Sequence, residues 1–290
     1  MTRARGRSAP RGAEPDPGRY EAHRRPKRSL GQNFLIDPNL QRKIAGAVGA
    51  GPGDPVLEIG PGRGALTEHL VRARVALTAV ELDDGLAAAL AERYRHDPRV
   101  EVVHGDILSL DLRALTSDWA ATRVVGNIPY NITTPIVFRL LRLPCPADIV
   151  VTVQAEVAAR ILAPPGTRTY GALTVGVAVH ADASAVCKVP RGAFRPVPKV
   201  DSVALRITPR SPPPLTPEAS RRVRALTRAA FSWRRKQLGT ILRRHPDLRC
   251  SAAWVEEALA ERSLAATLRP ERLSPDDFVA LSRALAEGSR

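Results

Sequence analysis

A glycine-rich turn between a predicted strand and a predicted helix constrains the fold of this chain most. The apolar run Val56–Ile59 predicts a strand, Leu66 and Leu70 recur at helical spacing, and the turn Gly60–Gly64 lies between them. Glycines here let a ligand approach the backbone and leave the helix N-terminus open toward it. The pattern predicts a strand–turn–helix unit with a ligand site at the turn.

The same alternation of strand and helix continues along the chain. Strands are predicted at 75–80, 100–103, 122–126, 148–153 and 203–208, and helices at 38–48, 85–94, 135–143 and 156–162. Residues 173–180 and 184–188 predict two further strands or a helix–strand pair. Short apolar strands alternating with helices predict an α/β fold, with a mostly parallel sheet covered on both faces.

A proline-rich run at 211–217 separates two parts of different pattern. Beyond it the pattern is purely helical, so we expect an α/β domain over 29–210 and a small helical domain with its linker over 211–290. Residues 1–28 hold nine Lys and Arg, three acids and almost no large apolar side chain. They predict a disordered basic arm, which would bind phosphates or be an inert extension.

The charge of the chain points to a polyanionic partner. Lys and Arg number 44 against 29 Asp and Glu, a formal net charge of +15, which favours nucleic acid over the alternative of a generally Arg-rich proteome. No apolar run approaches the roughly 20 residues of a membrane span, and no secretory signal is expected. The three cysteines form no CxxC pair, so we expect no metal site, no disulfide and a cytoplasmic location.

The glycine-rich turn predicts a cofactor that contains adenosine. It fits the G-x-G-x-x-A pattern of dinucleotide sites, and Glu81 ends the second strand, where a carboxylate holds ribose hydroxyls. The pattern alone fits NAD, S-adenosylmethionine or a plain turn. Glu58 favours S-adenosylmethionine, because its carboxylate would attract the methionine ammonium and repel a pyrophosphate. Asp106, after the third strand, is placed to accept a hydrogen bond from an adenine amine, although Gly-Asp is also a common turn.

The segment Gly126–Asn131 indicates methylation of a base amine. Such a nitrogen is a poor nucleophile because its lone pair is delocalised into the ring, so an enzyme must supply acceptors for both N–H bonds. The Asn127 side chain and the backbone carbonyl of Ile128 or Pro129 are such acceptors, and Tyr130 is placed to stack on the base. The alternative is an ordinary turn with a core tyrosine.

Two later segments predict contacts with the substrate. Phe194 precedes a rigid segment with prolines at alternate positions and would face the other side of the base, unless it is a core residue. Residues 221–249 hold ten Lys and Arg and one acid, and the cluster Arg234, Arg235 and Lys236 predicts a phosphate-binding surface. The alternative for this cluster is a solvated helix face.

Together these motifs resemble the rRNA adenine N6-dimethyltransferase family, over nearly the whole stretch from Arg28 to about Leu285. The segment Ser29–Asp37 is similar to the family's N-terminal motif that closes over the cofactor. The resemblance implies a Rossmann-like S-adenosylmethionine-dependent methyltransferase domain, a small C-terminal helical domain and a monomer. It implies that Tyr130 and Phe194 sandwich the adenine. It also implies cofactor contacts from Asn33, Leu35, Gly60, Glu81, Asp106 and Asn127.

Two branches of that family fit the sequence. One dimethylates two adjacent adenines in a 16S rRNA hairpin loop of the small-subunit precursor, and the other dimethylates one adenine of 23S rRNA and confers macrolide resistance. Segments 170–174, 194–202, 230–236 and 269–278 resemble the first branch, so we expect the 16S activity. Ala155 where Lys is usual, Val197 in place of Pro, and Ile128 depart from it. Two other classes of protein compete with the methyltransferase: an NAD-dependent oxidoreductase and a non-catalytic RNA-binding factor.

Overall fold

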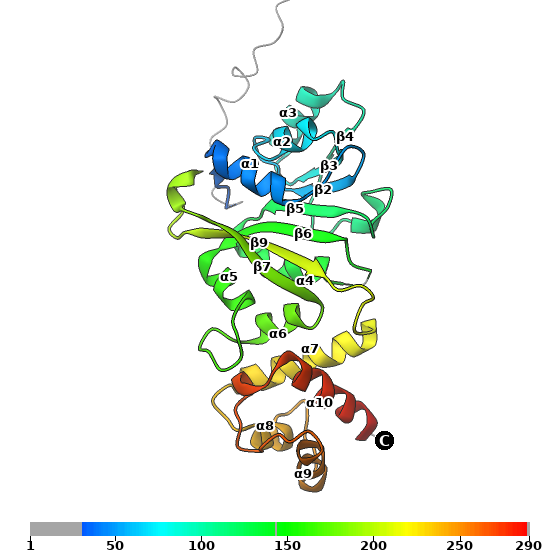
Figure 1. Ribbon diagram of the computed structural model, residues 1–290, viewed down its shortest axis with the longest axis vertical. Coiled ribbons are helices and arrows are strands. Elements are labelled where there is room, and N and C mark those ends of the chain that lie inside the picture. The colour runs from blue at the N-terminus through cyan, green and yellow to red at the C-terminus, as the bar shows by residue number, and fades with distance from the viewer. Residues whose placement is uncertain (1–30, 143, 289–290) are drawn as a thin grey trace, which may run out of the picture.

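The computed structural model describes residues 31–142 and 144–288 (Figure 1). The predicted arm 1–28 and the first two residues of the segment Ser29–Asp37 lie outside the described residues. No helix within the described ranges is long and apolar enough to cross a membrane.

A seven-stranded sheet forms the centre of the α/β part, in the order β4-β3-β2-β5-β6-β9-β7. Its strands are β2 (Pro55–Ile59), β3 (Ala76–Glu81), β4 (Val100–His104), β5 (Arg123–Asn127), β6 (Asp148–Gln154), β7 (Ala181–Val189) and β9 (Ser202–Pro209). The first five pair in parallel, whereas β9 runs antiparallel to both β6 and β7. The predicted α/β class is confirmed, and the antiparallel strand makes the sheet mixed.

Helices cover both faces of this sheet, as the alternating pattern predicts. They are α1 (Pro38–Ala47), α2 (Thr67–Arg72), α3 (Asp84–Tyr94), α4 (Thr133–Leu140), α5 (Ala155–Ile161) and α6 (Ala172–Ala178). One core cluster packs Ile136 of α4 and Ile161 of α5 against the sheet, and a second packs Ile44 of α1 and Leu70 of α2 against the other face. The ambiguous stretch 173–188 is a helix–strand pair, α6 followed by β7.

The C-terminal part is helical, as predicted. It holds α7 (Pro217–Ser232), α8 (Leu238–Arg244), α9 (Ala252–Ala260) and α10 (Pro275–Gly288). Its core does not stop at the proline-rich linker, because Tyr170 and Val175 of the α/β part are buried in the same cluster as Phe278. The Tyr170 hydroxyl donates to the Leu273 carbonyl at 2.8 Å. The helical part is therefore packed firmly below α6 (Figure 1).

The strand order places a crevice beyond the carboxyl ends of the central strands. The chain leaves β2 toward β3 on one side, and β5 pairs on the other side of β2. Ligands of open α/β sheets bind outside the carboxyl ends of the strands at such a reversal. A two-stranded ribbon of β1 (Phe34–Leu35) and β8 (Phe194–Arg195) lies apart from the main sheet.

Candidate active site

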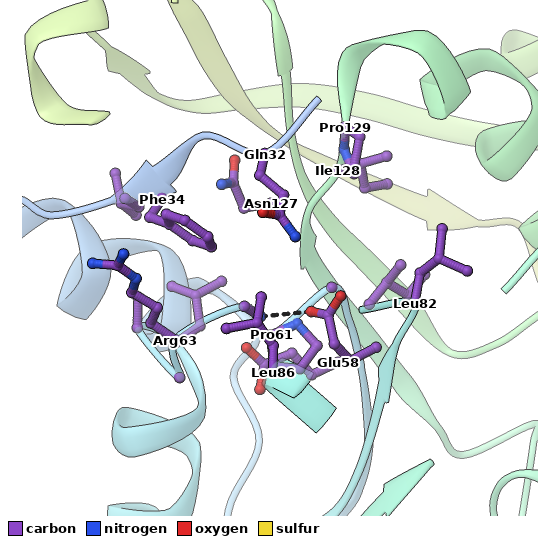
Figure 2. Close-up of a pocket in the computed structure, with 18 of the residues that line it drawn as sticks. Gln32, Phe34, Glu58, Pro61, Arg63, Leu82, Leu86, Asn127, Ile128 and Pro129 are labelled. Atoms are coloured by element: carbon purple, nitrogen blue, oxygen red, sulfur yellow. Dashed lines mark hydrogen bonds between the residues drawn. The ribbon is translucent and has the colours of Figure 1, made fainter. Parts of the chain in front are cut away.

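A cavity of about 350 Å³ opens at the carboxyl ends of β2, β3, β4 and β5. All six residues that the resemblance assigns to the cofactor line it, together with Pro129 and Tyr130. Figure 2 shows Phe34 and Arg63 on one side of the cavity, Leu82 on the other, and Gln32 and Asn127 between them. The structure thus brings together residues from four strand ends and from the segment that precedes α1.

The glycine-rich turn needs its glycines. Gly60, Gly62 and Gly64 have φ of +66°, +58° and +85°, a region that residues with a Cβ rarely adopt. A Cβ on Gly62 would also lie 3.1 Å from the Phe34 ring. The turn therefore passes close under the N-terminal segment, and its backbone faces the cavity.

Glu81 holds this turn and the start of α3 together. Its Oε2 accepts from the Gly62 N–H at 2.9 Å, and its Oε1 accepts from the Asp83 N–H at 2.9 Å. Burial raises the pKa of this carboxyl, and the backbone donors oppose that shift. Each carboxylate oxygen keeps a second lone pair, so Glu81 can also accept from a ribose hydroxyl.

Glu58 lies at the inner wall of the cavity and is only 2% exposed. The Thr67 hydroxyl donates to its Oε2 at 2.7 Å. Burial raises the pKa of Glu58 to about 7, because desolvation outweighs the hydrogen bond. A cation in the cavity favours the ionised form, so this residue suits a ligand that carries an ammonium group.

The N-terminal segment is hydrogen-bonded to the segment Gly126–Asn131, which we call the base motif. The Asn127 amide nitrogen donates to the Asn33 carbonyl at 2.8 Å, which leaves Oδ1 of Asn127 as the acceptor atom. The Arg63 guanidinium lies 4.6 Å from the centre of the Phe34 ring, within the range of a cation–π contact. Gln32 donates to Asp83 at 3.2 Å. The segment thus covers the cavity from the side of α1.

The base motif itself narrows the choice of acceptors. The Pro129 carbonyl already accepts from the Ile132 N–H at 3.1 Å and from the Thr133 hydroxyl at 3.3 Å, which fills its two lone pairs. No backbone donor among the described residues bonds to the Ile128 carbonyl. We expected the carbonyl of Ile128 or of Pro129 to accept from the base amine, and the structure leaves only that of Ile128 available. Tyr130 lines the cavity, and its hydroxyl is 2.8 Å from that of Ser202.

Residues 23–273 match the family described as ribosomal RNA adenine dimethylase. The chain belongs to this family. Ribosomal RNA small subunit methyltransferase A of Geobacter metallireducens is 43% identical over 264 residues, 90% of this chain and 96% of that protein. The protein of the same name from Enterococcus faecalis is 40% identical over 89% of this chain and 90% of that protein. Membership confirms the predicted methyltransferase class and S-adenosylmethionine as its cofactor.

Solved structures agree with this assignment. A dimethyladenosine transferase from Plasmodium falciparum superposes with a TM-score of 0.73 at 27% identity, covering 86% of this chain and 95% of that one. The 23S rRNA methyltransferase ErmE superposes with a TM-score of 0.66 at 32% identity, covering 88% of this chain and 100% of that one. The rival oxidoreductase class has no support in these likenesses.

Phe194 is not at the dimethylase cavity. Its side chain is fully buried in the second core cluster, with Leu35 and Val189, and it is not among the residues that line the cavity. A ring that stacks on a base needs an uncovered face, and this ring has none. The expected sandwich partner of Tyr130 is therefore corrected, for this conformation, to a core residue that anchors β8 against β1.

The basic cluster of the helical part divides into two kinds of residue. Arg235 and Lys236 are exposed. Arg234 is half-buried, donates to the Thr167 carbonyl at 3.1 Å and lies 3.9 Å from the Glu271 carboxylate. The prediction that all three form an exposed phosphate-binding face is thus corrected for Arg234, whose contacts join the helical part to the loop before α6.

Sequence reasoning missed several residues that shape the dimethylase site. Phe34, Arg63 and Gln32 line the cavity, and Ser202 fixes the Tyr130 hydroxyl. Phe34 and Gln32 flank Asn33 in the N-terminal motif, so their position beside a predicted cofactor contact was the signal that could have identified them. Ser202 is 72 residues from Tyr130, and only the pairing of β9 with β6 brings it near.

The pKa of Glu58 predicts how cofactor affinity depends on pH. A raised pKa keeps the carboxyl neutral below about pH 7, whereas a cationic cofactor binds the ionised form. The association constant for S-adenosylmethionine should rise between pH 6 and 7.5 by up to roughly eightfold, the change in ionised fraction. Higher pH is avoided because α-amino groups titrate near 8. Calorimetry on Glu58→Gln should give a clearly smaller rise, and an equal rise in that variant would contradict the assignment.

The burial of Phe194 predicts a large effect on stability. Phe194→Ala should lower the free energy of unfolding by about 3–5 kcal/mol, the usual cost of emptying a buried phenylalanine site. Chemical denaturation measures this directly. Phe194→Leu is the matched control and should lose much less, since it refills most of the volume. If the alanine variant kept full stability and lost only binding of the base, the sandwich role would be restored.

Proposed function

We propose that this dimethylase transfers methyl groups from S-adenosylmethionine to N6 of two adjacent adenines in a hairpin loop of 16S rRNA. The substrate would be the small-subunit precursor in the cytoplasm. One observation carries the proposal: Asn127 and Tyr130, with the free carbonyl of Ile128, stand at the edge of a cavity that fits the cofactor. These groups are what an enzyme needs to act on an aromatic amine.

Two observations favour 16S over 23S rRNA. Relatives named ribosomal RNA small subunit methyltransferase A reach 43% identity, whereas the 23S rRNA methyltransferase ErmE is 32% identical. Segments 170–174 and 269–278, which resemble the 16S branch in sequence, also meet in the structure, because Tyr170 donates to Leu273. Methylation of 23S rRNA stays the alternative.

The cavity residues fit S-adenosylmethionine group by group. Asp106 would accept from the adenine amine, Glu81 from the ribose hydroxyls, and Glu58 would face the methionine ammonium. The three carboxylates suit a ligand with cationic groups and would repel a pyrophosphate. When bound, the cofactor supplies an electrophilic methyl group on its sulfonium.

The base motif would prepare the nitrogen for attack. Asn127 Oδ1 and the Ile128 carbonyl accept the two N–H bonds of the adenine amine, which favours a pyramidal nitrogen with its lone pair directed at the methyl group. Asn127 is held in this orientation by its bond to the Asn33 carbonyl. The nitrogen becomes acidic once it is alkylated, so the same acceptors and water suffice to remove the proton.

Tyr130 would stack on the flipped adenine. Base–aromatic stacking contributes about 1–3 kcal/mol per base. The contact between the Tyr130 and Ser202 hydroxyls fixes the ring, so its position depends on the pairing of β9 with β6. Because the ring is anchored before the base arrives, little side-chain entropy is lost on binding.

The substrate assignment is tested by offering the enzyme both rRNAs. Purified small-subunit precursor particles and large-subunit particles are incubated with labelled S-adenosylmethionine, and the modified adenines are mapped by primer extension. Two adjacent dimethylated adenines in a 16S loop are expected. Label in 23S rRNA alone would establish the alternative branch.

The acceptor role of Asn127 predicts a loss of turnover. Asn127→Ala should lower the rate at saturating cofactor by ~10²–10³-fold, the usual effect of removing one oriented group of this kind. The exposed neighbour Asn131 provides the matched control, and Asn131→Ala should stay near the wild-type rate. Single-turnover measurements check this, and near-normal turnover of Asn127→Ala would refute the assigned role.

The exposed pair Arg235 and Lys236 predicts the salt dependence of RNA binding. Replacing both with Gln should lower the slope of log affinity against log salt by about 0.7–0.9 for every phosphate that the variant no longer binds. Arg95 and Arg113 provide the control, because they lie in the α/β part beside their own acids. Their replacement should leave the slope unchanged. An unchanged slope in the Arg235 and Lys236 variant would make this pair a solvated surface.

A further inference from the structure

The turn that presents Asp106 to the cavity is short and well defined. Asp106 Oδ1 accepts from the Leu108 N–H at 2.9 Å, and its backbone carbonyl accepts from Ser109 at 2.9 Å and Leu110 at 3.1 Å. These bonds use the N–H groups of the turn. The backbone carbonyls of Leu108 and Leu110 accept no hydrogen bond from within the turn.

Arg139 supplies both donors. One Nη donates to the Leu108 carbonyl at 2.5 Å, and the other donates to the Leu110 carbonyl. The side chain is half-buried and both bonds are partly buried, so fewer water molecules can compete for the two carbonyls. The planar guanidinium presents two parallel N–H donors, which a lysine ammonium cannot do.

Arg139 stands on α4, which starts directly after the base motif. The helix begins at Thr133, whose hydroxyl donates to the Pro129 carbonyl. One side chain thus connects the element that follows Asn127 and Tyr130 with the turn that carries Asp106. Arg139 is not among the described residues that line the cavity, so its effect on a ligand must pass through this turn.

We propose that Arg139 is a positioning residue that holds Asp106 in place for the exocyclic amine of the cofactor adenine. The proposal rests on the use of S-adenosylmethionine in the proposed function. Without Arg139 the two carbonyls turn toward water and the Asp106 carboxylate loses its fixed direction. The cofactor would still bind through the glycine-rich turn, Glu58 and Glu81, but the chain would distinguish adenine less well from a base without the amine.

The test compares two ligands that differ at that amine and at the adjacent ring nitrogen N1, which gains a proton when an oxo group replaces the amine. S-adenosyl-L-homocysteine carries the amino group, and S-inosyl-L-homocysteine carries an oxo group in its place. Calorimetry gives both dissociation constants for each variant. The wild type should prefer the adenine ligand by about 10- to 100-fold, the range of a hydrogen bond to a charged group. Arg139→Met should reduce this preference by roughly tenfold.

The ratio of the two dissociation constants separates an effect on the position of Asp106 from an effect on folding. A smaller share of folded protein lowers the active fraction equally for both ligands, so it cancels in the ratio. Arg139→Lys, which keeps the charge but cannot donate to both carbonyls at once, should give an intermediate ratio. Arg142→Met removes the same charge from an exposed site just beyond α4 and should leave the wild-type ratio unchanged.

A double-mutant cycle tests whether Arg139 acts on the ligand preference through Asp106. Asp106→Asn should abolish the preference, and adding Arg139→Met to it should change the ratio no further. A full wild-type ratio in Arg139→Met would overturn the positioning role while leaving the cofactor assignment intact. Failure of the wild type to bind S-adenosyl-L-homocysteine would overturn the cofactor assignment and this inference with it.

Discussion

The hydrogen bond from the Asn127 amide to the Asn33 carbonyl is the interaction on which the arrangement of the site depends. Asn127 ends β5, the strand beside β2 at the reversal of the sheet order, and Asn33 precedes α1. The bond fixes the acceptor oxygen of Asn127 and at the same time fastens the N-terminal segment over the cofactor cavity. In the proposed function, cofactor enclosure and preparation of the base would thus share one contact.

Two buried carboxyl groups, Glu58 and Glu81, line the cavity and suit a cationic ligand. Glu58 and Glu81 both have pKa values raised mainly by burial, so their hydrogen bonds offset only part of the cost of burying a charge, and a positively charged ligand would offset more of it. The same burial destabilises the fold as pH rises through the raised pKa, because the ionised form of Glu58 is then desolvated without a full partner. Cofactor binding and folding are therefore coupled through these two residues.

The sequence predicted much of the fold because its strands are buried apolar runs and its helices carry clear caps. Asp37 and Asp83 accept from the first N–H groups of α1 and α3. Gly60, Glu81 and Asn127 were singled out because they stand at a glycine-rich turn or a strand end, whereas Asn33 and Leu35 came only from the family resemblance. What sequence could not give were tertiary contacts: the burial of Phe194, the filled carbonyl of Pro129 and the inward contacts of Arg234.

The contacts of Tyr170 and Arg234 hold the helical part against the α/β part. Tyr170 is buried among the side chains of the helical core, and Arg234 reaches back to the loop that carries Thr167. The exposed cations Arg235 and Lys236 follow Arg234 directly in the chain, so the same contacts hold them at a fixed place relative to α6. A rigid phosphate-binding surface can select which loop of a folded RNA meets the cavity, because phosphate contacts position a substrate without reading its bases. In the proposed function, the choice of the adenine would then be left to Asn127, Ile128 and Tyr130, which would meet only the nucleotide that this geometry delivers.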